Sequence, residues 1–189
     1  MKKYTLKKSA FPAVLKGRRT VLRKHHPKEA NAVFAAIDKD RVRLGRFLPW
    51  ALLTKTPKHT LAFIAVSLEK WKIRDSFHYA VFSADGQFIG GIGLFDIQWD
   101  HGCAEIGYWL TQDAEGQGLM SDAVRTLEAV AFQKKFHRLE IRCDPANRKS
   151  SAVPERLGYH LDGRLRQNKH GTRGWHDTLV FGKLGPEKF

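Results

Sequence analysis

The spacing of apolar residues changes near Phe77, and this change constrains the fold more than any other feature of the sequence. Between Pro27 and Trp71, apolar residues recur at helical spacing. From Phe77 onward, segments 77–82, 88–97 and 103–110 are rich in β-branched and aromatic residues and are separated by glycine-containing turns. Short turns of this kind join antiparallel strands. The three segments are therefore predicted to form an antiparallel meander.

The elements on either side of this meander complete a mixed sheet. Residues 14–23 are predicted to form a first strand, followed by one helix that Pro27 opens and another that Thr56-Pro57 opens. The second helix is expected to pack on the sheet through Leu61, Ile64, Leu68 and Trp71. After the meander, the pattern predicts a helix with Ala123, Leu127, Val130 and Ala131 inward, a strand at 138–143, a short helix at 150–157 and two strands between 159 and 184.

This order of elements predicts an α/β (α+β) fold. Its sheet is expected to be mixed, mostly antiparallel, with about seven strands and helices on its faces. A chain of 189 residues favours one domain that spans 1–189.

The net charge bears on the partners. Lys and Arg outnumber Asp and Glu by 33 to 19, giving a formal charge of +14 that would attract polyanions: a phosphate-bearing cofactor, RNA or an acidic protein. Because the charge is spread along the whole chain, solvated basic faces also explain the excess. No apolar run approaches transmembrane length, so no membrane is expected.

Cysteine usage bears on location. Cys103 and Cys143 lie in apolar, strand-like contexts without metal-ligand spacing. This indicates free thiols and no metal site, and a reducing compartment, the cytoplasm, is expected. The sequence leaves a monomer and a homodimer equally open.

A glycine-containing loop, 115–120, joins the last strand of the meander to the next helix. Such a turn aims unpaired backbone N–H groups at one point, and Gly116 and Gly118 let the backbone adopt positive φ and approach a ligand. That point suits a pyrophosphate. A tight turn without a ligand would need the same glycines, and the loop is not a Rossmann fingerprint because the third glycine is missing.

Two motifs together resemble a known family. The loop with Gly116 and Gly118 is followed, after one helix and one strand, by a run that holds Asn147, Ser150, Val153, Glu155, Leu157 and Gly158-Tyr159 in order. Both motifs and their separation resemble the RimJ/RimL branch of the GNAT N-acetyltransferases, which acetylates ribosomal-protein N-termini. Leu48-Pro49-Trp50 and the last two strands also resemble family positions, so the resemblance covers nearly the whole chain.

The resemblance implies an acetyl-CoA site between two parallel strands that splay apart, here 104–110 and 138–143. It implies that the amine attacks the thioester directly, without an acyl-enzyme. Ser150 would protonate the leaving thiolate, and Glu105 is the candidate general base. The cofactor-binding residues would be Leu110, Gly116, Gln117, Gly118, Leu119, Met120, Asn147, Arg148 and Lys149, and the substrate-binding residues Trp50, Tyr79 and Trp109.

Simpler roles compete with these assignments. Asn147 and Ser150 are also good helix N-caps, Arg148 and Lys149 also suit a solvated pair, and each aromatic residue also suits the core. The sequence departs from the family at two positions. Glu115 replaces a glutamine or arginine and would repel pyrophosphate if it faced it, and Lys169 stands where a glutamate base is expected.

The resemblance predicts an enzyme that acetylates a primary amine, foremost the N-terminal α-amine of a protein. An α-amine with a pKa near 8 is substantially neutral at physiological pH, so it needs only a weak base. A polyamine or an aminated antibiotic is an alternative acceptor. From another class, a binding module for RNA or ribosomal protein that has lost turnover is the alternative that Glu115 and Lys169 favour.

Overall fold

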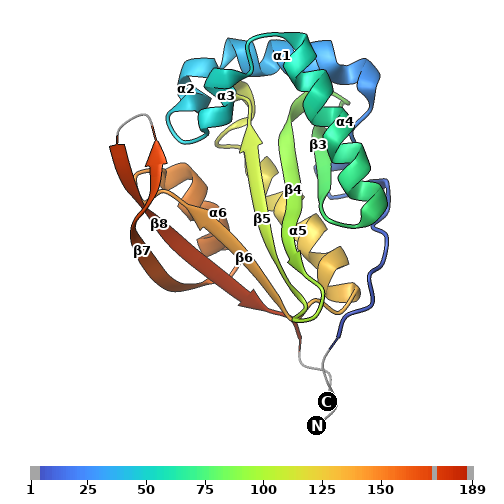
Figure 1. The fold of residues 1–189 in the computed structure, drawn as a ribbon, viewed down its shortest axis with the longest axis vertical. Helices are drawn as coiled ribbons and strands as arrows, with labels where there is room; N and C mark the ends of the chain where they lie inside the picture. The colour runs from blue at the N-terminus through green and yellow to red at the C-terminus, as the bar shows by residue number, and fades with distance from the viewer. Residues whose placement is uncertain (1–4, 172–173, 187–189) are drawn as a thin grey trace.

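The computed structural model describes residues 5–171 and 174–186. Its described part is built on an eight-stranded sheet with the order β1-β2-β3-β4-β5-β6-β8-β7 (Figure 1). Neighbouring strands are antiparallel except for β5 and β6, which are parallel. The strands are β1 (Val14–Lys16), β2 (Thr20–Lys24), β3 (Phe77–Ser83), β4 (Phe88–Gln98), β5 (Cys103–Leu110), β6 (Arg138–Cys143), β7 (His160–Gly171) and β8 (Gly174–Leu184). The predicted mixed, mostly antiparallel sheet is confirmed.

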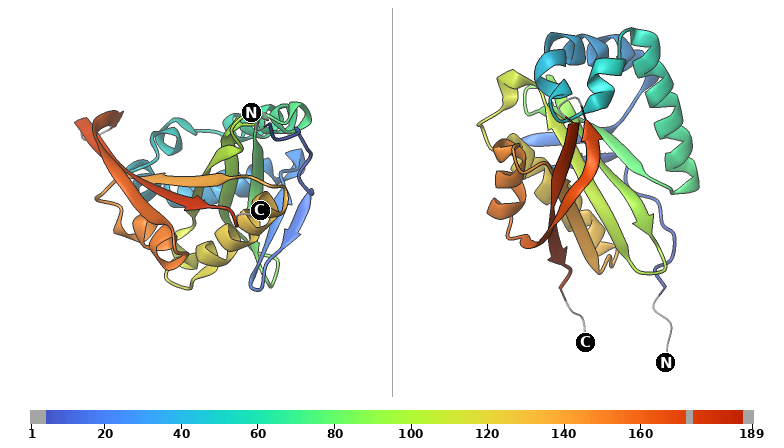
Figure 2. Two further views of the ribbon diagram at one scale, coloured as in Figure 1. Left: turned by 90° about the horizontal axis from the view of Figure 1, so that it is seen from below. Right: turned by 60° about the vertical axis from the view of Figure 1, so that its left-hand side comes forward.

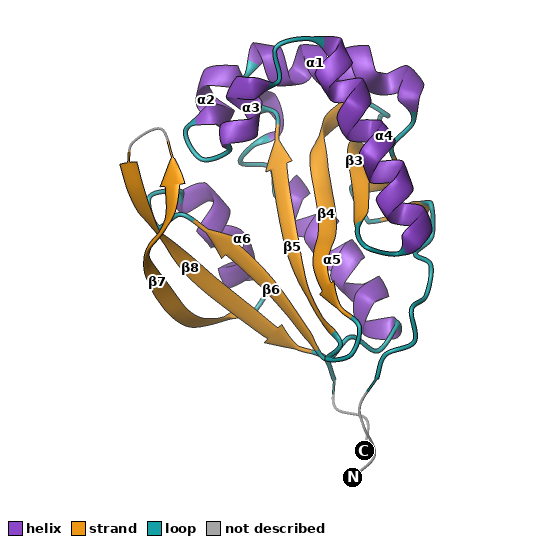
Figure 3. Cartoon of the chain, in the orientation of Figure 1, coloured by secondary structure: helices purple, strands orange, loops and turns teal. Residues whose placement is uncertain are grey.

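The helices lie at one end and on both faces of this sheet. They are α1 (Ala30–Lys39), α2 (Arg41–Gly45), α3 (Pro49–Leu53), α4 (Pro57–Ile73), α5 (Leu119–Gln133) and α6 (Arg148–Arg156), with single 3-10 turns η1 (Pro27–Glu29) and η2 (Gln112–Ala114). Helices α1 to α3 cross the end of the sheet where β5 finishes, α4 runs along one face, and α5 and α6 lie on the other (Figure 3). The β7–β8 hairpin extends away from the rest of the sheet (Figure 2).

The main core lies between the sheet and α5. Ala123, Leu127 and Ala131 of α5 are fully buried, as predicted, and Val130 is partly buried against the same cluster. They share the cluster with Leu22, Tyr79, Leu94, Ile106, Leu139, Ile141 and Phe181, which come from six strands of the sheet. Each fully buried aliphatic side chain stabilises the fold by about 1.5–3 kcal/mol. This packing fixes the N-terminus of α5 beside the end of β5.

The predicted first strand is wrong in one respect. Residues 14–23 form two short antiparallel strands, β1 and β2, because the chain reverses at Gly17, whose N–H donates to the Thr20 carbonyl over 2.8 Å. This turn raises the strand count from the predicted seven to eight. It also carries Arg18 and Arg19 out of the sheet.

The predicted contact face of α4 is also partly wrong. The helix begins at Pro57 after the extended N-cap Thr56, as expected, but it buries Thr60, Ile64, Ser67 and Trp71. Leu61 is exposed. Both faces follow helical spacing, so the large apolar residues alone did not identify the packed one. Among the described residues, no helix is long and apolar enough to cross a membrane.

Candidate active site

Strands β5 and β6 separate midway along their length. They pair in parallel only at Cys103–Arg138, Ala104–Leu139 and Glu105–Glu140. Beyond this point β5 continues to Leu110 and β6 to Cys143 without pairing to each other, and Figure 1 shows them diverging. The Tyr108 hydroxyl on β5 donates to the Ser150 carbonyl over 2.9 Å and so links the strand to α6. The predicted splayed parallel pair is therefore present.

The loop that follows β5 presents free backbone donors. Gly116 and Gly118 both have φ of 74°, a left-handed conformation that costs other residues roughly 1–2 kcal/mol. Nothing lies within 4 Å of a Cβ added at Gly116, so the backbone angle and not crowding requires glycine there. In the described chain, none of the backbone N–H groups of residues 116–120 donates to a protein acceptor. These donors, at the N-terminus of the 15-residue α5, have the arrangement that binds anions in other proteins.

Glu115 is held between two cations. One carboxylate oxygen pairs with Arg43 of α2, and the other lies 2.5 Å from Lys149 of α6. Arg43 also donates to the Leu110 carbonyl over 2.6 Å and to Asp40 over 2.8 Å. Glu115 thus ties the loop to helices on either side. The predicted phosphate contact of Lys149 competes with this ion pair.

The β1–β2 turn supports the loop from a third side. Asp122, in the first turn of α5, accepts hydrogen bonds from the backbone N–H groups of Arg18, Arg19 and Thr20 and from the Thr20 hydroxyl. Burial alone would raise the pKa of Asp122, but these hydrogen bonds lower it overall. The Arg19 side chain then reaches the Gln117 carbonyl over 2.5 Å. This arrangement places a guanidinium beside the free N–H groups of the loop.

Helix α6 brings its polar N-terminus to the opening between the strands. Asn147 is the N-cap, and its side-chain oxygen accepts from the Ser150 N–H over 3.2 Å. The competing capping role predicted for Asn147 is therefore present. Burial raises the pKa of the Cys143 thiol, at the end of β6, to about 11, and the side chain of Ser150 partly opposes this rise. Arg148 lies exposed in the first turn.

Glu105 lies where β5 and β6 stop pairing. Its carboxylate is mostly buried and stands 3.5 Å from the Arg142 guanidinium. Burial raises the pKa of Glu105, the charges of Arg142 and Lys169 oppose this rise, and those of Asp96 and Glu140 add to it. Lys169, at the position of the expected glutamate, comes from β7 and pairs in register with His176.

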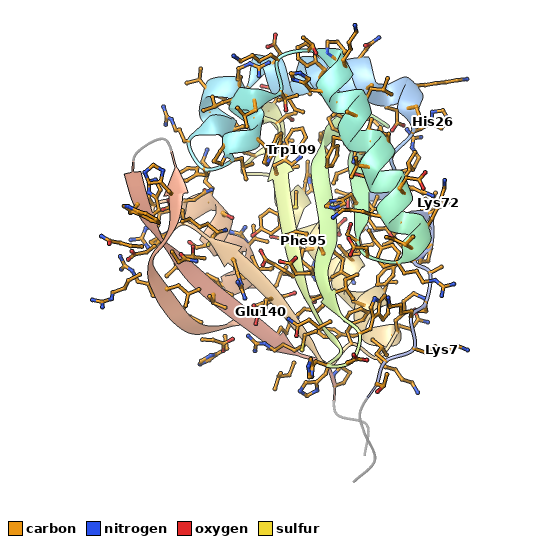
Figure 4. The ribbon with its side chains drawn as sticks, in the orientation of Figure 1. Lys7, His26, Lys72, Phe95, Trp109 and Glu140 are labelled. Carbon is orange, nitrogen blue, oxygen red and sulfur yellow. The ribbon has the colours of Figure 1, made fainter. Side chains whose placement is uncertain are left out.

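The aromatic candidates divide into two groups. Trp50 and Trp109 contact edge to face, with ring centroids 5.9 Å apart, near the end of β5 that α3 covers (Figure 4). Trp50 remains 38% exposed. Tyr79, predicted to bind substrate, is fully buried, and its hydroxyl donates to the Pro12 carbonyl over 2.9 Å. That prediction is therefore wrong, because no surface of Tyr79 is accessible to a substrate.

Several contributors to this site were not predicted. Arg43, Asp40, Arg19 and Tyr108 all hold the loop or the opening in place. Asp40, for instance, accepts a 2.6 Å hydrogen bond from the N–H of Gln112, which lies 72 positions later in the sequence. Nothing in the local sequence marks these residues, because their partners are distant in the chain.

The assembled site fits acetyl-CoA. The free N–H groups of residues 116–120, beside Arg19, suit a pyrophosphate. The side chains of Leu119 and Met120 are buried, so these two residues offer their backbone alone. Unpaired strand edges beyond Glu105 and Glu140 offer amide groups to an extended pantetheine arm.

Comparisons with known proteins agree with this geometry. The acetyltransferase (GNAT) domain family matches residues 19–160. YdaF of Bacillus subtilis, provisionally assigned as a ribosomal N-acetyltransferase, is 29% identical over 162 residues, which cover 84% of this chain and 86% of YdaF. The ribosomal-protein-serine acetyltransferase of Escherichia coli is 26% identical over 153 residues, 80% of this chain and 85% of its own.

Solved structures show the same fold. RimL, described as a ribosomal L7/L12 alpha-N-protein acetyltransferase in complex with coenzyme A, superposes with a TM-score of 0.86 at 21% identity, covering 90% of this chain and 97% of RimL. The family match extends from the β1–β2 turn through the loop of residues 115–120 and α6 to the start of β7. This chain therefore belongs to the GNAT acetyltransferase family.

Proposed function

We propose that this protein transfers the acetyl group of acetyl-CoA to the N-terminal α-amine of a protein. The observation that carries the proposal is the combination of the β5–β6 opening with the free N–H groups of residues 116–120 at its edge. Relatives named as ribosomal-protein acetyltransferases support a protein N-terminus as acceptor. When bound, acetyl-CoA supplies the thioester carbonyl that the amine attacks.

The two faces of the sheet carry different parts of the proposed site. Ser150 and the loop of residues 115–120 lie toward α5 and α6, whereas Glu105 and Arg142 line a groove on the face that carries α4. The amine would approach from the groove and lose its proton to Glu105. Because burial raises the pKa of Glu105, this carboxylate is a stronger base than an ordinary glutamate.

Ser150 is proposed to deliver a proton to the departing sulfur. Ser150 lies in the first turn of α6, and its side chain acts on the Cys143 thiol at the end of β6, where the strands have separated. Tyr108 fixes the backbone of Ser150 through its 2.9 Å hydrogen bond. The Asn147 cap fixes the same turn of α6.

The non-catalytic alternative loses one of its two arguments. It depended on repulsion between Glu115 and pyrophosphate, but Arg43 and Lys149 neutralise that carboxylate. Lys169 remains as a departure from the family. It does not leave the proposed site without a base, because Glu105 is the candidate carboxylate.

Acetylation of a peptide tests the proposal directly. The protein is incubated with acetyl-CoA and a peptide with a free α-amine, beside the same peptide blocked at its N-terminus and carrying an internal lysine. Mass spectrometry should find the acetyl group on the free α-amine. Ser150→Ala should lower kcat about 100-fold or more, whereas Ser83→Ala, at the remote β3–β4 turn, should not. Acetylation of the lysine alone would contradict the proposal.

A further inference from the structure

A groove of about 920 Å³ lies on the α4 face of the sheet, where β5 and β6 begin to separate. Its wall includes Phe95 and Glu140, which Figure 4 marks on β4 and β6. The volume is in the upper range of small-ligand sites, which span roughly 300–1,000 Å³. The groove is therefore larger than a reacting amine requires.

Glycines in the sheet make room for flat aromatic rings along this groove. A Cβ at Gly93 would lie 2.5 Å from the His78 ring, and one at Gly107 would lie 2.8 Å from the Phe95 ring. His78 and Phe95 stack with centroids 6.1 Å apart and planes 9° apart. Burial lowers the pKa of His78 to about 4, so this ring is neutral at physiological pH.

The charge of the groove is opposite to that of the protein. The chain as a whole carries +14. The groove, however, is lined by four carboxylates, from Asp75, Asp96, Glu105 and Glu140, against the cations of Lys70 and Arg142. Such an inversion favours a positively charged ligand in a protein that otherwise repels one.

Most of these carboxylates are already engaged. Glu140 accepts from Arg138 and Arg142, and Asp75 lies 3.1 Å from Lys70. Glu105 faces Arg142 at 3.5 Å. Asp96 is exposed, and its charge acts on Arg142 and Glu105, but among the described residues its carboxylate has no hydrogen-bond or ion-pair partner. Asp96 is therefore the charge that the groove offers to a ligand.

The backbone at Asp96 is specialised. Its φ is 49°, a left-handed conformation that aspartate and asparagine adopt more readily than other residues with side chains, and it lies in a β-bulge between Phe95 and Gln98. A bulge re-aims a side chain. Here it turns Asp96 into the lining of the groove.

A second polar group beside Asp96 lacks a partner. Ser76 lines the groove and is only 1% exposed, yet its hydroxyl has no hydrogen-bond partner among the described residues. Because Phe77 pairs with Leu94, Ser76 comes next to Phe95 and Asp96 in the antiparallel register. Buried hydroxyls are normally satisfied. A ligand that donates hydrogen bonds would contact the exposed Asp96 carboxylate and supply the bond that the Ser76 hydroxyl lacks.

We propose that this groove is the subsite for the residue after the acetylated one and that it selects a basic side chain there, with the cation bound by Asp96 and the Ser76 hydroxyl. The inference rests on the proposed transfer to a protein α-amine, with that amine at Glu105. Register supports the path, because Phe95, next to Asp96, pairs with Glu105. An extended acceptor rises about 3.3–3.6 Å per residue, so its next side chain lies within reach of the bulge.

Three matched peptides test the subsite. They begin Ser-Arg, Ser-Gln and Ser-Glu and share the remaining sequence; arginine is chosen because it cannot itself be acetylated at physiological pH. The rate of CoA thiol release gives kcat and KM. The native protein should prefer the arginine peptide over the glutamine peptide about tenfold or more in kcat/KM, chiefly through KM, and the glutamate peptide should be poorest.

Variants then assign the preference to Asp96. Asp96→Asn keeps the side-chain shape and tolerates the left-handed backbone, so the arginine preference, measured against the glutamine peptide on the same variant, should fall to about threefold or less. Asp100→Asn removes the same charge from the next turn, outside the groove, and should keep the preference. Ser76→Ala should lower it about twofold to threefold.

The possible outcomes distinguish failure of the subsite proposal from failure of the proposed acetylation. Equal rates on the three peptides, or an arginine preference that survives both Asp96→Asn and Ser76→Ala, would overturn the subsite and leave α-amine acetylation intact. Acetylation of spermidine with no reaction on any peptide would overturn both proposals.

Discussion

Glutamine at position 115 removes one negative charge from the loop between β5 and α5 and keeps the size of the side chain. In the native protein the Glu115 carboxylate pairs with Arg43 and lies 2.5 Å from Lys149. The Glu115 side chain is 19% exposed, whereas Lys149 is 78% exposed. The pair with Arg43 is therefore the stronger of the two, because solvent screens the other.

The effect on acetyl-CoA affinity follows from where the carboxylate points. If it faced the pyrophosphate, its removal would strengthen binding by about 1–2 kcal/mol, or roughly 5- to 30-fold. Because its oxygens face Arg43 and Lys149, removal of the negative charge only leaves these two cations uncompensated. At a separation of about 8 Å in water this contributes about 0.5 kcal/mol, and salt reduces it further. We expect the Kd of Glu115→Gln to stay within about threefold of the native value.

The effect on stability is expected to be larger. Glu115→Gln loses the charge of its hydrogen bonds to Arg43 and Lys149, at a cost of about 1–2 kcal/mol. For a chain of this size, that loss lowers Tm by roughly 2–8 °C. Lys149→Met, which removes the exposed partner, should cost less than about 1 kcal/mol.

Calorimetric titration with acetyl-CoA and thermal unfolding measure both quantities on the native protein, Glu115→Gln and Lys149→Met. Binding more than about tenfold tighter in Glu115→Gln, with an unchanged Tm, would refute the reasoning. That result would mean that the carboxylate faces the ligand and that the ion pairs with Arg43 and Lys149 contribute nothing.

Other perturbations test the parts of the site separately. Arg19→Gln should raise KM for acetyl-CoA about three- to tenfold, and Arg18→Gln, on the same turn, should raise it less; equal effects in steady-state assays would contradict the placement of Arg19 beside the loop. Glu105→Gln should abolish the fall in kcat/KM that the native enzyme shows as pH drops through the raised pKa of Glu105. The raised pKa means that the fold disfavours the ionised carboxylate, so the native protein loses stability as pH rises through the pKa of Glu105. Glu105→Gln should therefore have the larger free energy of unfolding at pH 7, measured in urea. Asp122→Asn should cost about 2–3 kcal/mol at neutral pH, because the carboxylate accepts four hydrogen bonds. The pKa of Asp122 is lowered, so the difference in free energy of unfolding between variant and native protein should disappear only when pH falls through that lowered pKa. A difference that does not depend on pH would argue against the hydrogen bonds.

Local patterns predicted most elements because their causes are local. Strands β5 and β6 have the predicted bounds, since alternation, turn glycines and flanking polar residues lie within a few positions of each other. The glycines of the loop were found for the same reason: a positive φ is a property of one residue. The splay of β5 from β6 came from the family resemblance alone.

Errors arose where packing chose between equivalent local patterns. Tyr79 suits a pocket or a core by its chemistry, and only its position between Trp71 and the Pro12 carbonyl assigns it to the core. Two faces of α4 have helical spacing, and the packed one includes Thr60 and Ser67. The turn at Gly17 was read as strand because its stabilising partner, Asp122, lies 102 positions after Thr20.

By itself, the sequence determined the order of elements, the alternation that builds the sheet and the glycines that expose the N–H groups after β5. Only the tertiary structure decided that Glu115 is neutralised, that Arg19 stands beside the loop and that Asp96 and Ser76 share one groove. The physical reason is the sequence distance over which each effect acts. Backbone angles and hydrophobic periodicity act over a few residues, whereas the charge that a carboxylate experiences depends on groups that folding brings from distant parts of the chain.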